Sequence, residues 1–100
     1  MIVHNVYFWL NDNVTSDEIE AFKNELKALK SIDGVVDLQL GRPAQTLRDI
    51  VDKSYSIGLM VVFTDIEAHD RYQADVKHVN FIENNKDKWN KIQIYDIKSD

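Results

Sequence analysis

The chain has 100 residues, 44% of them hydrophobic and 29% charged, which is typical of one globular domain and excludes a disordered chain. Its net charge of −5 argues against nucleic acid or an anionic membrane as a partner, because both attract basic surfaces. It contains no cysteine, so disulfides, thiolate catalysis and cysteine-ligated metals are excluded.

The sequence also predicts the cellular compartment of the protein and the absence of a cofactor and a metal. No basic region precedes the first apolar run, and that run ends near Leu10, too short to span a membrane. With the absence of cysteine, this predicts a cytoplasmic protein. No phosphate-binding glycine loop is present, and His4, His69 and His78 show no zinc-ligand spacing, so we expect no cofactor and no metal.

The first predicted element is a strand over Ile2–Leu10, which is rich in β-branched and aromatic residues. Side chains alternate between the two faces of a strand, and here both faces are largely apolar. One face carries His4, Val6, Phe8 and Leu10, and the other carries Val3, Asn5, Tyr7 and Trp9. We therefore expect both faces of this strand to be covered.

A helix is predicted next. Thr15 and Glu18 form a capping box at its start, and Gly34 follows its end. Its apolar residues recur at helical spacing on one stripe. That stripe consists of Ile19, Phe22, Leu26 and Leu29.

Two more strands are predicted around a long polar segment. The first covers Val35–Leu40, with Val36, Leu38 and Leu40 on one face, and the second, the most apolar, covers Tyr55–Phe63. The segment 41–54 between them is a loop with weak helical character at 45–51.

The last third of the chain predicts two helical segments and a strand. A second capping box, Thr64 with Glu67, opens a helix that continues to about Gln73. We expect His69 to be a solvated residue of this helix. A further helix is expected over 76–84, a turn over 84–87 and a final strand over 91–97.

The resulting order β-α-β-β-α-β predicts an α+β, ferredoxin-like fold for residues 1–100 as a single domain. Its helices cover one face of an antiparallel sheet and leave the other face bare. The residues expected on the bare face are Tyr7, Trp9, Met60, Val62 and Tyr95. An apolar face of this kind predicts association, and the simplest partner is a second copy of the chain, giving a homodimer.

Several motifs resemble the stress-responsive α/β-barrel (Dabb) family. The chain opens on His4-x-Val6-x-Phe8, and the segment from Tyr72 through His78 to Phe81 is similar to the family signature Tyr-x-x-His-Pro-x-His-x-x-Phe. The resemblance extends over essentially the whole chain. It implies a dimeric α+β barrel.

The resemblance also implies a function. Members of the olivetolic acid cyclase type use a histidine base and a tyrosine donor, and these roles fall on His78 and Tyr72. The family pocket implies ligand contacts from His4, Phe22, Ile57, Leu59, Trp89 and Ile92. Asp75 and Val76 depart from the signature, and Ile57 replaces a pocket-lining histidine of the cyclase.

Three functional hypotheses follow. The first is a protein that binds a small apolar or aromatic carbonyl compound in a helix-side pocket, as a cofactor-independent cyclase or isomerase. The second is a non-catalytic stress-responsive or assembly protein, in which His78 only ties two helical segments together by a backbone hydrogen bond, His4 is a core histidine and Tyr72 is a core wall. The third is a metal- or haem-associated barrel with His4 or His78 as ligand.

Overall fold

The computed structural model describes all residues from 1 to 100 as four strands and three α-helices. The helices are α1 (Ser16–Ala28), α2 (Ile66–Ala74) and α3 (Val76–Asn85), and short 3-10 turns follow at Leu29–Ser31 and Lys86–Lys88. The strands are β1 (Ile2–Leu10), β2 (Val35–Gly41), β3 (Ile57–Phe63) and β4 (Trp89–Lys98). None of the helices is long and apolar enough to cross a membrane.

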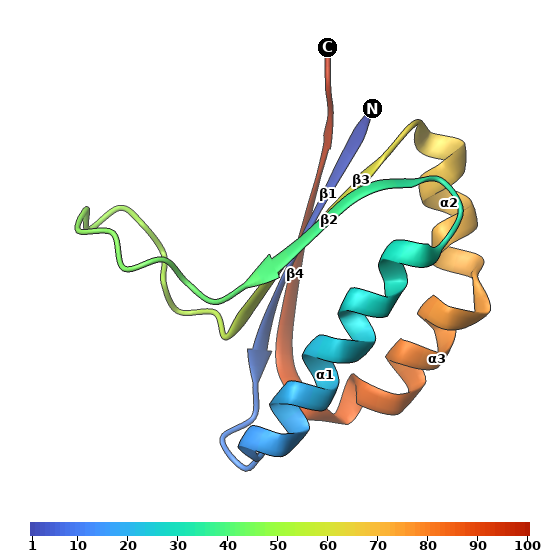
Figure 1. The fold of residues 1–100 in the computed structure, drawn as a ribbon. Helices are drawn as coiled ribbons and strands as arrows, with labels where there is room; N and C mark the ends of the chain where they lie inside the picture. The colour runs from blue at the N-terminus through green and yellow to red at the C-terminus, as the bar shows by residue number, and fades with distance from the viewer.

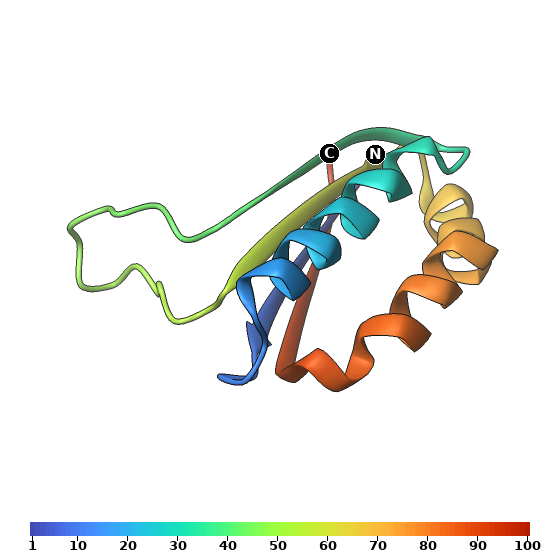
Figure 2. The same cartoon turned by 60° about the horizontal axis from the view of Figure 1, so that its bottom comes forward.

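The strands form one antiparallel sheet in the order β2-β3-β1-β4. Figure 1 shows the first strand and the last strand running side by side, and Figure 2 shows all three helices on the same side of the sheet. This is the α+β ferredoxin-like arrangement predicted from the element order, with the second helix divided into α2 and α3.

The hydrophobic core lies between the helices and the sheet. Every second residue of β3, and of β1 from Ile2 to Phe8, is buried, as the alternation predicts. The aromatic centre of the core is formed by Phe8, Phe22, Phe81 and Trp89, whose rings pack at centroid distances between 5.1 and 6.3 Å. The helices are therefore held to the sheet mainly by burial of large apolar side chains.

Local signals set the helix boundaries. The Thr15–Glu18 capping box is present in full, with the Thr15 hydroxyl accepting from the Glu18 amide and the Glu18 carboxylate accepting from the Thr15 amide. The prediction that Thr64 caps α2 is wrong, because the Asp65 carboxylate accepts from the Ala68 amide instead. A carboxylate at this position also interacts favourably with the helix macrodipole.

Three predictions about β2, the segment after it and the start of β3 are corrected. A β-bulge between Val35 and Asp37 turns Val36 out to 51% exposure, while Val35 packs on the core. The bulge inserts one residue into β2, so Val35 and Val36 exchange the faces that a regular strand would give them. No helix forms at 45–51, and β3 begins at Ile57 rather than at Tyr55, so the segment 42–56 projects beyond the sheet (Figure 1).

The face of the sheet opposite the helices is uncovered and aromatic. Tyr7 packs against Tyr55 and Tyr95, with ring centroids 4.9 and 6.4 Å apart, and Lys91 lies 4.3 Å above the Trp9 ring. Met60 and Val62 are only half-buried on the same face. The predicted association surface is thus a continuous open face of this single chain.

We predict that Trp9→Glu converts a homodimer into a monomer. A charge at this site would have to lose its hydration when two open faces meet. Sedimentation velocity at micromolar concentration should show the unmodified chain near twice its own mass and the variant near one chain mass. Val76→Glu is the control, since Val76 is 66% exposed at the start of α3 on the helix side and should leave the dimer intact. A monomeric unmodified chain would rule the dimer out.

We also predict that Gly34→Ala destabilises the fold by about 1–3 kcal/mol, the usual cost of a strained backbone residue. Gly34 has φ +92°, and an added Cβ would lie 2.8 Å from the Ala68 Cβ on α2. Gly41→Ala is the matched control, because nothing lies within 4 Å of its added Cβ. Urea unfolding of both variants measures the difference, and equal stabilities would contradict the proposed contact.

Candidate functional site

A cavity of about 90 Å³ lies between the sheet and the helices. Of its 13 lining residues, 10 are hydrophobic, and the others are His4, Gln73 and His78. Ile92 and Ile94 of β4 line it while remaining 37% and 44% exposed, so the cavity reaches solvent along this edge strand. The arrangement is a small apolar space with a few convergent polar groups, the usual form of a small-molecule site.

Tyr72 contributes a buried phenol to the cavity. Its side chain is 1% exposed on α2, and its ring lies 4.8 Å from both the Phe63 and the His78 rings. Burial raises the pKa of the Tyr72 phenol, so the hydroxyl stays protonated. No group of the chain forms a hydrogen bond with the Tyr72 hydroxyl. Every fully buried side-chain polar atom of the chain has a hydrogen-bond partner, so this hydroxyl is not fully buried and reaches accessible space. It is a donor available to a ligand.

His78 faces the same cavity from the first turn of α3. Its Nδ1 lies 3.2 Å from the Gln73 carbonyl oxygen, across the break between α2 and α3 at Asp75. A carbonyl only accepts, so Nδ1 carries the proton in neutral His78 and Nε2 is left as a hydrogen-bond acceptor. The backbone bond expected of a structural histidine is therefore present, and it also fixes the tautomer that a base needs.

The pKa of His78 lies below its ordinary value. Burial among apolar groups is the largest cause, since it disfavours the charged ring, and the bond to the Gln73 carbonyl opposes this shift. Proximity to His4 and His69 lowers the pKa of His78 further, and Asp75 raises it. At neutral pH the ring is uncharged and able to accept a proton.

His4 is a buried histidine paired with a carboxylate from the edge strand. It is 3% exposed on β1, and the strand register places it directly opposite Asp96 of β4. His4 Nδ1 lies 2.5 Å from Asp96 Oδ1. Burial lowers the pKa of His4 and outweighs the opposing effect of Asp96. Neutral His4 therefore donates from Nδ1 to the carboxylate and presents the rest of its ring to the cavity.

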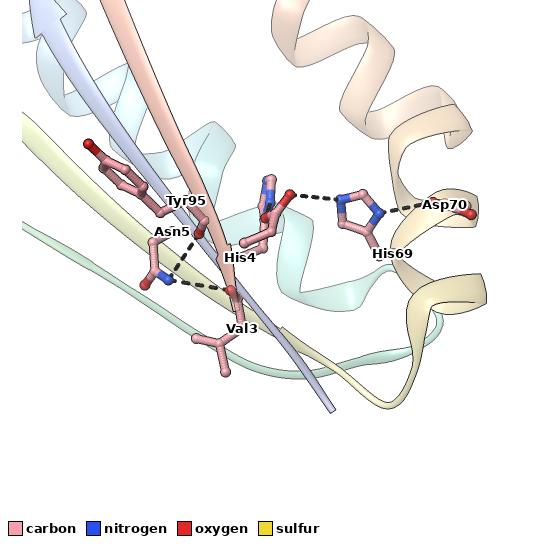
Figure 3. A network of polar contacts seen from close by, with 7 residues as sticks. Val3, His4, Asn5, His69, Asp70 and Tyr95 are labelled. Carbon is pink, nitrogen blue, oxygen red and sulfur yellow. Dashed lines mark hydrogen bonds and ion pairs between the residues drawn. The ribbon is translucent and has the colours of Figure 1, made fainter. Parts of the chain in front are cut away.

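His69 is not the solvated helix residue that the sequence predicts. Its side chain is only 16% exposed, and its ring packs 5.2 Å from the His4 ring and 5.5 Å from Phe63. Its Nδ1 lies 3.0 Å from Asp70 and its Nε2 lies 3.9 Å from Asp96. Figure 3 shows His69 beside Asp70 on α2. The alternation of β1 and β4 turns both His4 and Asp96 toward α2, which explains this packing.

The structure brings together five of the eight residues that the sequence proposes for the site. His4, Leu59, Tyr72, His78 and Ile92 all line the cavity. The other three, Phe22, Ile57 and Trp89, do not line it and pack within or against the hydrophobic core.

Sequence reasoning missed Asp96 and His69. For Asp96 a signal exists, because Ile92, Ile94 and Asp96 alternate on one face of β4, and a carboxylate on that helix-side face needs a polar partner.

Comparisons with known proteins agree with this fold. A Dabb protein from Mesorhizobium loti with a ferredoxin-like fold is 27% identical, with a TM-score of 0.80, and 98% of this chain and 95% of that chain are covered. A dimeric ferredoxin-like protein of unknown function from Thermobifida fusca is 17% identical, with a TM-score of 0.82 and coverage of 98% and 90%.

A third structure, the hydroxynitrile lyase from Passiflora edulis, is 12% identical, with a TM-score of 0.85 and coverage of 99% and 93%. No curated protein sequence matches the chain. The family model of the stress responsive A/B barrel domain, Dabb, matches residues 2–99. The chain therefore belongs to the Dabb family of stress-responsive A/B barrel domains.

Proposed function

We propose that this Dabb protein binds a small apolar carbonyl compound in the helix-side cavity and moves a proton on it, with His78 as base and Tyr72 as hydrogen-bond donor. The observation that supports the proposal is the pairing of two complementary groups in one apolar cavity. The Tyr72 hydroxyl has no partner within the chain, and His78 Nε2 is free of its proton.

The two groups suit the chemistry of an acidic C–H bond. Neutral His78 accepts the proton next to a carbonyl, and the Tyr72 hydroxyl stabilises the negative charge that develops on the carbonyl oxygen. The return of the proton to another atom of the same molecule gives an isomerisation, and attack on a second carbonyl of that molecule gives a cyclisation. Neither reaction needs a cofactor.

The size of the cavity restricts the ligand. A volume of about 90 Å³ equals that of about three water molecules and is below the usual range of about 300–1,000 Å³ for drug-sized ligands. The favoured ligand is therefore a carbonyl compound of a few heavy atoms. A longer chain, such as the linear polyketide of a cyclase, requires Ile92 and Ile94 to move at the open edge of the cavity.

Two similarities to enzymes support a catalytic function. The Passiflora edulis neighbour is a lyase that acts on a hydroxynitrile, and at 12% identity it shares the fold. The olivetolic acid cyclase resemblance assigns the base and donor roles to His78 and Tyr72. The chain departs from that enzyme at Ile57, which is 2% exposed in the core and does not line the cavity.

A second candidate function is assembly without catalysis. The His78 bond to the Gln73 carbonyl favours it, because it joins α2 to α3 whether or not a ligand binds. A variant that keeps this bond and removes the base separates the two functions. The amide of glutamine can donate to the Gln73 carbonyl but is not a base.

We predict that His78→Gln lowers the rate of proton abstraction by about 2–4 powers of ten, the usual contribution of a general base. The assay is deuterium exchange from D₂O at the α-carbon of butanone or propanal, followed by proton NMR. Tyr72→Phe should reduce the rate less, since the phenol only assists. Urea unfolding must show both variants folded. Undiminished exchange in folded His78→Gln would rule out the base, and no exchange with the unmodified chain would favour assembly alone.

We predict that this exchange rate increases with pH and reaches a plateau before neutrality. The active form of His78 is neutral, and burial holds its pKa below the ordinary value of 6.5. The unfolded chain binds a proton at this site near pH 6.5 while the folded chain does not. The contribution of His78 to the free energy of unfolding is therefore fully present above pH 6.5, and it decreases as the pH falls below 6.5. NMR titration of the His78 ring should agree with the rate profile, and a midpoint above 6.5 in either measurement would contradict the burial argument.

A further inference from the structure

Three potential metal ligands converge beside α2, and one of them, His4, also lines the helix-side cavity. His4 of β1, His69 of α2 and Asp96 of β4 each offer one ligand atom, and these atoms all lie within 4.8 Å of one another. They come from positions far apart in the chain, so no spacing motif in the sequence predicts this cluster. Figure 3 shows the His69 ring pointing from α2 toward His4.

The geometry points to a binding site for a divalent transition-metal ion such as Zn²⁺, formed by His4 Nδ1, His69 Nε2 and the Asp96 carboxylate. Two imidazoles and one carboxylate are a frequent ligand set for zinc and for related ions. Three protein ligands also leave a coordination position open.

The three ligand atoms need only a small rearrangement to reach the distances of a zinc site. Ligand atoms about 2.0–2.2 Å from a tetrahedral zinc ion lie about 3.3–3.6 Å from one another. The two observed separations lie on either side of this range, at 2.5 Å from His4 Nδ1 to Asp96 Oδ1 and at 3.9 Å from His69 Nε2 to Asp96 Oδ2. The Asp96 side chain is 46% exposed, so it is free to turn. The ion would take the place of the proton that His4 donates to Asp96.

A second observation supports the site independently. His69 Nδ1 lies 3.0 Å from the Asp70 carboxylate. A carboxylate only accepts, so this contact holds a ring proton on Nδ1, and in the neutral ring Nε2 is then the nitrogen able to bind an ion. A carboxylate behind a histidine in this way is the usual outer partner of a metal ligand, because it fixes the ring and increases its basicity.

The open side of the site faces a recess in the surface. His69 and Asp96 line this recess of about 570 Å³ together with Asp65 and Glu67. It provides an entry path for the ion and room for an external ligand such as water or a carboxylate. Tyr72 and His78 do not line it, so binding here does not depend on the proposed proton transfer.

The experiment is a titration of metal-depleted protein with Zn²⁺, followed by calorimetry and by the visible absorption of Co²⁺ as a substitute. We expect one ion per chain. Asp96→Asn and His69→Gln should each abolish binding or weaken it by more than about 100-fold, and Asp70→Asn by about 10–100-fold, as expected for an outer partner. His4 is left unchanged because it is buried in the core.

Two matched controls separate this site from other acidic or imidazole groups. Glu67→Gln removes one negative charge from the same recess and keeps all three ligands, so it should bind Zn²⁺ within a few-fold of the unmodified chain. His78→Gln removes the histidine outside the cluster and should bind equally well. Absence of binding, equal binding in Asp96→Asn and His69→Gln, or loss of binding in His78→Gln would each overturn the site.

Discussion

The central strand β1 is the constraint on which the rest of the structure depends. It is hydrogen-bonded to β3 on one side and to β4 on the other, so its register fixes both neighbours. It also places one polar residue, His4, among apolar side chains on the buried face. An unpaired polar group at this depth costs about 1–3 kcal/mol, and the register removes that cost by bringing Asp96 opposite. Register, core and site are therefore determined together.

The local chemistry of the sequence was sufficient for most of the fold. The capping box at Thr15 and the break at Asp75 depend on neighbouring residues only, and both were predicted correctly. The errors occurred where two local solutions compete or where pairing between strands decides. Asp65 replaces Thr64 as a cap because either side chain is able to accept from the helix amides, and the charged group binds more strongly. The bulge that turns Val36 outward depends on pairing with β3, which no local pattern in β2 contains.

The candidate site was less accessible to sequence reasoning than the fold. Tyr72 and His78 came from the family resemblance, since six residues across a helix break do not define a distance. Their convergence requires the turn at Asp75, where the bond from His78 to the Gln73 carbonyl brings the ring back over the end of α2. The contact of His69 with Asp96 joins α2 to the last strand, and only the packing of α2 against the sheet creates it.

One imidazole ring connects the two parts of the site. Neutral His4 has a single ring proton, and Asp96 holds it on Nδ1, so Nε2 is an acceptor. A metal ion on Nδ1 displaces this proton and leaves neutral His4 with its proton on Nε2, as a donor. The same ring lines the cavity beside Tyr72, with centroids 6.2 Å apart. Occupation of the surface cluster therefore changes the hydrogen-bonding character of the cavity wall, although the two sites share no other residue.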